Sequence, residues 1–101
     1  MSRSKYGNVK HRGYDSRRES RRAEELAWME KAGEIQDLRE QVRFELIPKQ
    51  DGERAAHYVA DFVYQKDGSQ IVEDAKGHRT DMYRLKRKLM LWVHGIRIVE
   101  T

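Results

Sequence analysis

Three ionisable residues in the second half of the chain have the types and spacing for chemistry with a metal ion. Asp61 lies in an apolar run and shares its face with Val59 and Val63, where an unpaired carboxylate costs several kcal/mol. Asp74 and Lys76 follow in a second apolar run and, being two residues apart, share one face of a strand. If the strands place Asp61 across from Asp74, two carboxylates and one ammonium group converge.

Such a group of side chains has two explanations. Two close carboxylates repel each other, and a divalent cation would relieve the repulsion. Alternatively, Lys76 forms a buried structural ion pair with Asp61 or Asp74 and no ion is bound. On these residues alone, both explanations stay open.

The chain must fold so that its strands bring these residues together. Alternating or continuous apolar residues predict four strands, at residues 42–46, 58–64, 71–76 and 96–99. Pro48 ends the first strand, and residues 50–53 form a turn. Residues 66–68, Lys-Asp-Gly, predict a hairpin between the second strand and the third.

A helix is expected before the strands, at residues 16–32. Ser16 and Glu19 have the spacing of a capping box, in which each side chain satisfies a backbone amide of the first turn. Gly33 lies where a helix commonly ends.

A second helix is expected at residues 80–93, with Thr80 as its N-cap and Gly95 after its end. One side of this helix is apolar and the other is basic; the apolar side carries Met82, Leu85, Leu89 and Trp92. These residues, Trp28 and the other Met residues are expected in the core or in an interface. The order of elements predicts an α+β fold with a central mixed sheet flanked by two helices.

The composition excludes several classes of protein. The 101 residues are 38% hydrophobic and 38% charged, enough for one small domain, expected at residues 14–101 after a flexible basic arm at 1–13. The chain has no cysteine, so a disulfide framework, a cysteine nucleophile and a thiolate zinc site are excluded. No apolar run approaches the roughly 20 residues that cross a bilayer, so we expect a cytoplasmic protein without a membrane partner.

The net charge of +4 is unevenly distributed along the chain. Basic residues prevail in 1–22 and 76–101, and acidic residues prevail in 23–75. This distribution could surround an anionic pocket with positive surfaces, or it could simply be the uneven charge of a soluble protein.

The same residues resemble a known pattern, that of the PD-(D/E)XK nuclease superfamily. Its acidic residue followed by acid-x-lysine corresponds here to Asp61 and to Asp74-Ala75-Lys76, with Ala60 in place of the usual proline. More of the chain looks like a small phage-encoded family of unknown function that is similar to endonuclease I-type Holliday junction resolvases. The matching segments are residues 5–8, 14–19, 31–35, 43–46, 58–62 and 72–77.

The resemblance implies a restriction-endonuclease-like core and a Mg²⁺- or Mn²⁺-dependent endodeoxyribonuclease. Asp61, Asp74 and the main-chain carbonyl of Ala75 would hold the ion, and Glu19 would hold it, or a second ion, through water. Lys76 would orient the nucleophile and stabilise negative charge. For Glu19, the capping box with Ser16 is the competing role.

The expected partner is DNA, held through phosphate contacts that carry no sequence information. Branched DNA, as in phage recombination, and a homodimer are expected by analogy. A non-catalytic nucleic-acid-binding phage protein is the alternative function, and for the helix cations the alternative is a solvated face. The candidate DNA-binding residues are Arg17, Arg18, Arg21, His78, Arg79, Thr80, Lys86 and Arg87.

Overall fold

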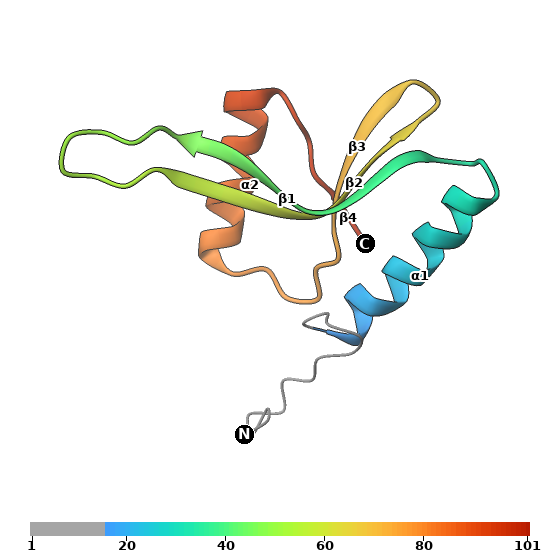
Figure 1. The fold of residues 1–101 in the computed structure, drawn as a ribbon. Helices are drawn as coiled ribbons and strands as arrows, with labels where there is room; N and C mark the ends of the chain where they lie inside the picture. Colours follow the sequence, from blue (N-terminus) through green and yellow to red (C-terminus); the bar gives the residue numbers. More distant parts are fainter. Residues whose placement is uncertain (1–15) are drawn as a thin grey trace.

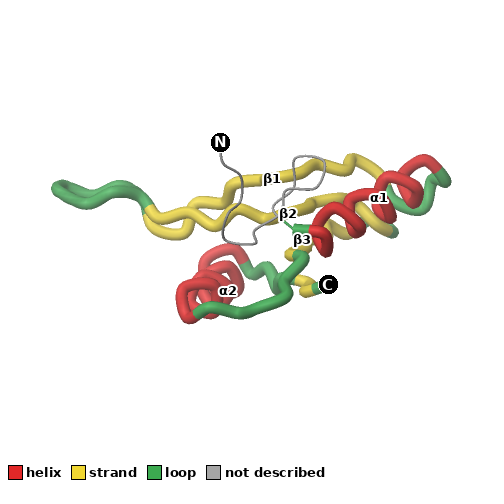
Figure 2. The backbone as a smooth tube through the Cα atoms, turned by 90° about the horizontal axis from the view of Figure 1, so that it is seen from below, coloured by secondary structure: helices red, strands yellow, loops and turns green. Residues whose placement is uncertain are grey.

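A four-stranded sheet with one helix against each of its faces forms the fold (Figures 1 and 2). The computed structural model describes residues 16–101, so the expected basic arm at 1–13 lies outside the described residues. The expected order α-β-β-β-α-β and the α+β class are confirmed. The elements are α1 (Arg17–Lys31), β1 (Gln36–Ile47), β2 (Ala56–Lys66), β3 (Ser69–Asp74), α2 (Asp81–His94) and β4 (Val99–Glu100).

The sheet is mixed, as expected. Its order is β1-β2-β3-β4, with antiparallel pairing except between β3 and β4, which are parallel. The hairpin between β2 and β3 turns at Asp67 and Gly68, whose φ angles of 52° and 80° are those of a tight two-residue turn. The longer hairpin of β1 and β2 turns at Gln50 and Glu53, and its tip extends beyond both helices (Figure 2).

Both helices are capped by the residues that the sequence indicated. Ser16 Oγ accepts a hydrogen bond from the Glu19 amide at 3.1 Å, and Thr80 Oγ1 accepts one from the Tyr83 amide at 3.0 Å. Gly95 follows α2 in the left-handed conformation, with φ 69°, which suits a residue without a side chain. These caps fix where each helix begins and where α2 ends.

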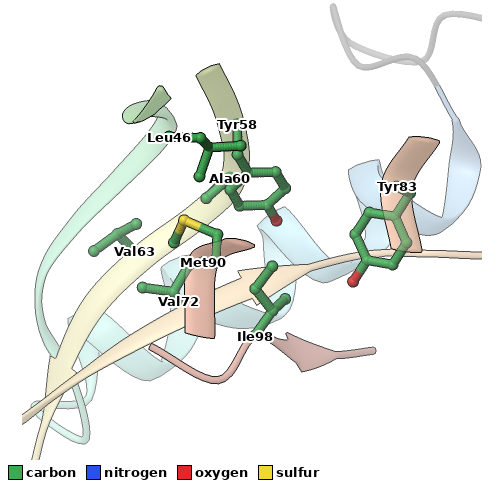
Figure 3. Close-up of a cluster of buried hydrophobic side chains, with 8 residues drawn as sticks. All are labelled: Leu46, Tyr58, Ala60, Val63, Val72, Tyr83, Met90 and Ile98. Carbon is green, nitrogen blue, oxygen red and sulfur yellow. The ribbon is translucent and has the colours of Figure 1, made fainter. Parts of the chain in front are cut away.

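The core is divided by the sheet into two clusters. Phe62 packs with Leu26 of α1, whereas its neighbour Val63 packs with Met90 of α2. Consecutive strand residues point to opposite faces, so the two helices cover opposite sides of β2. Figure 3 shows Met90 reaching among Ala60, Val63 and Val72 in the cluster on the α2 side.

The expected apolar face of α2 is wrong by about one residue around the helix. Of the four expected residues, Leu89 is partly buried and packs against the cluster on the α2 side, whereas Met82, Leu85 and Trp92 are exposed, Trp92 at 83%. The buried residues of α2 are Tyr83 and Met90. Adjacent residues lie about 100° apart around a helix, so two neighbouring stripes can both look apolar. The small sheet covers only one of them.

Trp28 is also outside the core, with 70% of its surface exposed on α1. The apolar residues that α1 buries in the cluster with Phe62 are Ala23 and Leu26. A core position for Trp28 and Trp92 is therefore wrong within this chain, and an interface position stays a prediction.

The bounds of all four strands differ from the expected ones; β2, for example, spans Ala56–Lys66 instead of residues 58–64. β1 starts at Gln36 instead of residue 42, β3 ends at Asp74 instead of residue 76, and β4 is Val99–Glu100 instead of 96–99. Backbone hydrogen bonds nevertheless continue past β3: the Lys76 amide donates to the Thr101 carbonyl at 3.2 Å, and the Thr101 amide donates to the Asp74 carbonyl at 3.0 Å. The backbone of Lys76 is thus held although it lies outside the strand.

Candidate functional site

Asp61 lies where the alternation of side chains along β2 changes. Ala60 and Val63 pack on the α2 side of the sheet, but Phe62 packs on the α1 side. In a regular strand, Ala60 and Phe62 would share one face. Gln41 of β1, between the partners of Ala60 and Phe62, has a φ of 54°, which side-chain-bearing residues seldom adopt. The irregular backbone therefore surrounds Asp61.

Pairing of β2 with β3 brings Asp61 beside Asp74. Phe62 pairs with Glu73, so the preceding and following residues, Asp61 and Asp74, are neighbours across the strands. Asp61 Oδ2 also accepts a hydrogen bond from the Ala75 amide at 2.8 Å, which ties β2 to the end of β3.

The two carboxylates and Lys76 line one hollow of about 290 Å³, called here the Asp61 hollow. The three residues that the sequence singled out therefore meet at one place on the surface. The remaining lining comes from β2, the segment before α2 and the first turns of α2: Tyr58, Val59, Thr80, Met82, Tyr83 and Lys86.

Asp74 is the more buried of the two aspartates and is held from two sides. Its Oδ2 accepts a hydrogen bond of 2.6 Å from the Tyr58 hydroxyl, and its Oδ1 lies 3.4 Å from Lys76 Nζ. The Lys76 ammonium also lies 4.3 Å from the centre of the Tyr83 ring, a distance typical of a cation–π contact. These contacts fix the directions of both charged groups.

The surroundings of Asp61 disfavour the ionised form of its carboxyl group. Burial raises the pKa of its carboxyl group to about 7, and the negative charges of Asp74 and, more weakly, Glu19 act in the same direction. The Ala75 amide and Lys76 oppose the shift without cancelling it. A bound cation would favour the ionised carboxylate and so oppose this shift.

The buried Tyr58 hydroxyl keeps its proton. Burial and its hydrogen bond to Asp74 both raise the pKa of Tyr58 far above the usual range. Tyr58 therefore remains a hydrogen-bond donor that orients the Asp74 carboxylate. The sequence did not indicate this contact, because Tyr58 lies on the α2 side of the sheet only as a result of the irregular backbone at Asp61.

Glu19 is close enough to influence Asp61, but it is not part of a three-ligand cluster. Its Oε2 accepts a hydrogen bond from Gln41 Nε2 at 2.9 Å. Within residues 16–101, no three His, Asp or Glu side chains lie close enough together to hold one metal ion. The Glu19 amide donates to Ser16 Oγ, which is the half of the capping box that the Ser16 side chain supplies; the capping role of the Glu19 side chain stays a prediction.

The oxygen donors at the site fit Mg²⁺ without a third carboxylate. Mg²⁺ prefers hard oxygen ligands, keeps several waters, and is usually bound by one or two protein carboxylates together with substrate phosphates. Asp61 and Asp74 supply that number. The Oδ1 atom of Asp61 makes no hydrogen bond to the residues that the structure describes, so it remains available as a ligand.

A buried ion pair on the other face of β3 was missed by the sequence analysis. Glu73 is fully buried and receives two hydrogen bonds from Arg22 of α1, at 2.6 and 3.0 Å, and one from Tyr64 at 2.6 Å. Thr101 donates to the same carboxylate at 3.2 Å. This cluster docks α1 on the sheet and thereby positions Glu19.

Two of the candidate DNA-binding residues, Thr80 and Lys86, line the Asp61 hollow. His78 is exposed between β3 and α2. On α1, Arg17 and Arg21 line a separate hollow of about 260 Å³. Arg18 is exposed, and it donates to the Thr101 carbonyl at 3.5 Å.

Arg79 and Arg87 are held by an acid that the sequence did not single out. Glu100 of β4 pairs with Arg79 at 2.6 Å and with Arg87 at 2.9 Å, and it also accepts a hydrogen bond of 2.7 Å from the Tyr83 hydroxyl. These contacts, led by the bond from Arg79, lower the pKa of Glu100 to about 2. Both arginines therefore already form ion pairs within the fold.

Comparisons with known proteins identify a family but no activity. The model of a family described as "Protein of unknown function (DUF1064)" matches residues 3–95 of the chain. No curated protein and no solved structure matches. Neither helix within residues 16–101 is long and apolar enough to span a membrane.

Proposed function

The chain belongs to the DUF1064 family of proteins of unknown function, and from its site we propose that it is a Mg²⁺- or Mn²⁺-dependent endodeoxyribonuclease. One observation carries the proposal. The carboxylates of Asp61 and Asp74 line the same hollow as the Lys76 ammonium, and their closeness contributes to the raised pKa of Asp61. Such a strained pair with an adjacent cation is typical of catalytic sites.

Each residue of the hollow has a distinct role in the proposal. Asp61, Asp74 and the Ala75 carbonyl hold the ion, and Glu19 contributes through water. The ion supplies Lewis-acid stabilisation of a phosphoryl oxygen and a more acidic water. Lys76, fixed between Asp74 and the Tyr83 ring, orients the attacking water and offsets negative charge on the phosphate.

The proposed substrate is DNA recognised by its shape. Lys86 at the rim of the Asp61 hollow and the exposed cations of α1 offer phosphate contacts, which carry no base information. Cleavage of branched DNA, such as a four-way junction, suits this mode of binding. Symmetric cutting of a junction also requires two sites related by a twofold axis, which is the basis for proposing a homodimer.

A non-catalytic nucleic-acid-binding protein is the second candidate. It is favoured by the contact of 3.4 Å between Lys76 and Asp74, which equally suits a structural ion pair. In that case neither aspartate would need a metal ion.

Cleavage assays with variants separate the two candidates. The purified protein is incubated with Mn²⁺ or Mg²⁺ and linear, flapped or four-way DNA, and products are resolved by electrophoresis. We expect metal-dependent cleavage, reduced by at least roughly 100-fold in Lys76→Ala and Asp61→Asn. The matched controls Lys49→Ala and Asp51→Asn change the same residue types at the exposed tip of the β1–β2 hairpin and should cut normally.

Two results would overturn the proposal. One is a wild-type protein that binds DNA but never cuts it with either metal. The other is a Lys76→Ala protein that cuts as fast as the wild type.

A further inference from the structure

A second hollow lies beside α2, and nothing in the proposed reaction uses it. It has a volume of about 370 Å³, and we call it the Arg97 hollow. Its lining residues come from the second half of α2, from the segment that leads into β4 and from β4 itself: Arg87, Lys88, Leu91, Arg97, Ile98 and Glu100.

The charge of the Arg97 hollow is positive. Three of its lining residues are cationic and only Glu100 is anionic. Glu100 is already neutralised by Arg79 and Arg87, and the resulting low pKa keeps it ionised and paired. Lys88 and Arg97 make no ion pair with the residues that the structure describes and are exposed, so their charges face solvent.

The two hollows open on different sides of the same helix. Lys86 lines the Asp61 hollow and Lys88 lines the Arg97 hollow. Two residues correspond to about 200° around a helix axis, so the two lysines point in nearly opposite directions. Tyr83, which lines the Asp61 hollow, donates a hydrogen bond to Glu100, which lines the other, so the two hollows are connected through this contact.

We infer that the Arg97 hollow is a second anion site, which binds a backbone phosphate of the nucleic acid whose strand is cut in the Asp61 hollow. This inference rests on the proposed function. A helix is about 10 Å across, which corresponds to roughly three nucleotide steps of 3.4 Å along a duplex. One DNA molecule lying over α2 can therefore reach both hollows. Arg87, Lys88 and Arg97 supply charge-assisted hydrogen bonds to phosphate oxygens.

The test is the salt dependence of DNA binding. Fluorescence anisotropy measures the affinity of the wild type and of Lys88→Ala/Arg97→Ala for a labelled four-way junction in EDTA, where no cutting occurs, across a range of salt concentrations. Each phosphate that the protein neutralises contributes roughly 0.9 to the steepness of log K against log salt, so the double variant, which loses the one phosphate of the Arg97 hollow, should have a slope shallower by about 0.9. Arg87 is left unchanged because it holds Glu100.

A matched double variant controls for the loss of total charge. Lys49→Ala/Arg54→Ala removes one lysine and one arginine from the hairpin tip and should keep the wild-type slope. Excess inorganic phosphate, at constant ionic strength, is the second arm: it should not abolish junction binding if the site needs a polymer. Full competition would mean that the hollow is a site for free phosphate, which overturns the inference.

The failure of the inference is distinguishable from that of the proposed function. If the Lys88→Ala/Arg97→Ala protein keeps the wild-type slope, or loses no more than the Lys49→Ala/Arg54→Ala protein, the Arg97 hollow is not a phosphate site, although cleavage can stand. If the wild type binds no DNA at any salt concentration, the proposed function itself fails.

Discussion

At the scale of single residues, the Asp61 carboxylate costs the folded chain stability. Its half-buried position and the nearby negative charges raise its pKa from 3.8 to about 7, so ionisation is easier in the unfolded chain than in the folded one. The Ala75 amide and Lys76 act in the opposite direction without cancelling the shift. A residue that opposes folding while facing a polar hollow is typical of a functional site.

Replacing Asp61 with asparagine should therefore stabilise the protein at neutral and alkaline pH. The stability associated with Asp61 is fully present below about pH 4, where the group is protonated in both states. It is lost as the pH rises toward the folded-state pKa of about 7. The asparagine side chain cannot ionise, and its amide oxygen can still accept the hydrogen bond from the Ala75 amide.

Urea unfolding at pH 4.5 and pH 8 measures this effect. We expect Asp61→Asn to gain on the order of 1–2 kcal/mol relative to wild type between these pH values, after allowing for solvent screening of a half-buried group. The exposed Asp51→Asn control should show no such gain. An identical pH dependence for the wild type and Asp61→Asn would contradict the electrostatic account.

At the scale of secondary-structure elements, α1 is joined to the sheet by one buried ion pair as well as by apolar packing. The Arg22 guanidinium meets the fully buried Glu73 carboxylate through two hydrogen bonds. The cost of removing both charged groups from water offsets much of the attraction between them. Removing only one partner, however, would leave the other charge buried without compensation and would destabilise the fold. The pair thus fixes the position of α1 and of Glu19.

The variant Arg22→Met leaves Glu73 buried without a cation and should lower the free energy of unfolding by roughly 3–5 kcal/mol. The double variant Arg22→Met/Glu73→Gln should recover part of that loss, because the uncompensated charge is gone. Chemical denaturation measures both. Arg21→Met, on the exposed side of α1, is the control and should change stability by less than about 0.5 kcal/mol. A small effect of Arg22→Met would show that apolar packing alone docks α1.

Local sequence signals predicted the order of these elements but not all of their faces. The caps Ser16 and Thr80 and the turn before Ser69 depend on neighbouring residues, so they could be read from short segments. The inward face of α2 could not, because Met82 and Tyr83 begin adjacent stripes, and contact with the sheet and Glu100 selects Tyr83.

The candidate site was likewise predictable only in part. Asp61, Asp74 and Lys76 could be singled out because acids in apolar strands are costly and a two-residue spacing shares a face. The contact from Tyr58 to Asp74 could not, because it depends on the irregular backbone opposite Gln41. The Glu73 pair could not either, since its cation comes from a distant helix.

At the scale of the whole molecule, folding places charged residues from separate parts of the sequence around two hollows. The acidic residues Asp61 and Asp74 lie in one hollow, and cations of α2 line both that hollow and the Arg97 hollow. Residues 100 and 101 hold this arrangement together, because Glu100 binds α2 and Thr101 binds the backbone beside Asp74. The site therefore depends on contacts that residues 100 and 101 make with α2 and with the end of β3.

The most direct test of the account is to locate a bound cation. Substoichiometric Mn²⁺ is added to ¹⁵N-labelled protein, and the paramagnetic broadening of amide resonances is mapped along the chain. We predict broadening centred on Asp61, Asp74 and Ala75 in the wild type and in Asp51→Asn, and its loss in Asp61→Asn. Broadening that is absent, or that centres elsewhere and persists in Asp61→Asn, would contradict the claim that these two carboxylates hold the ion.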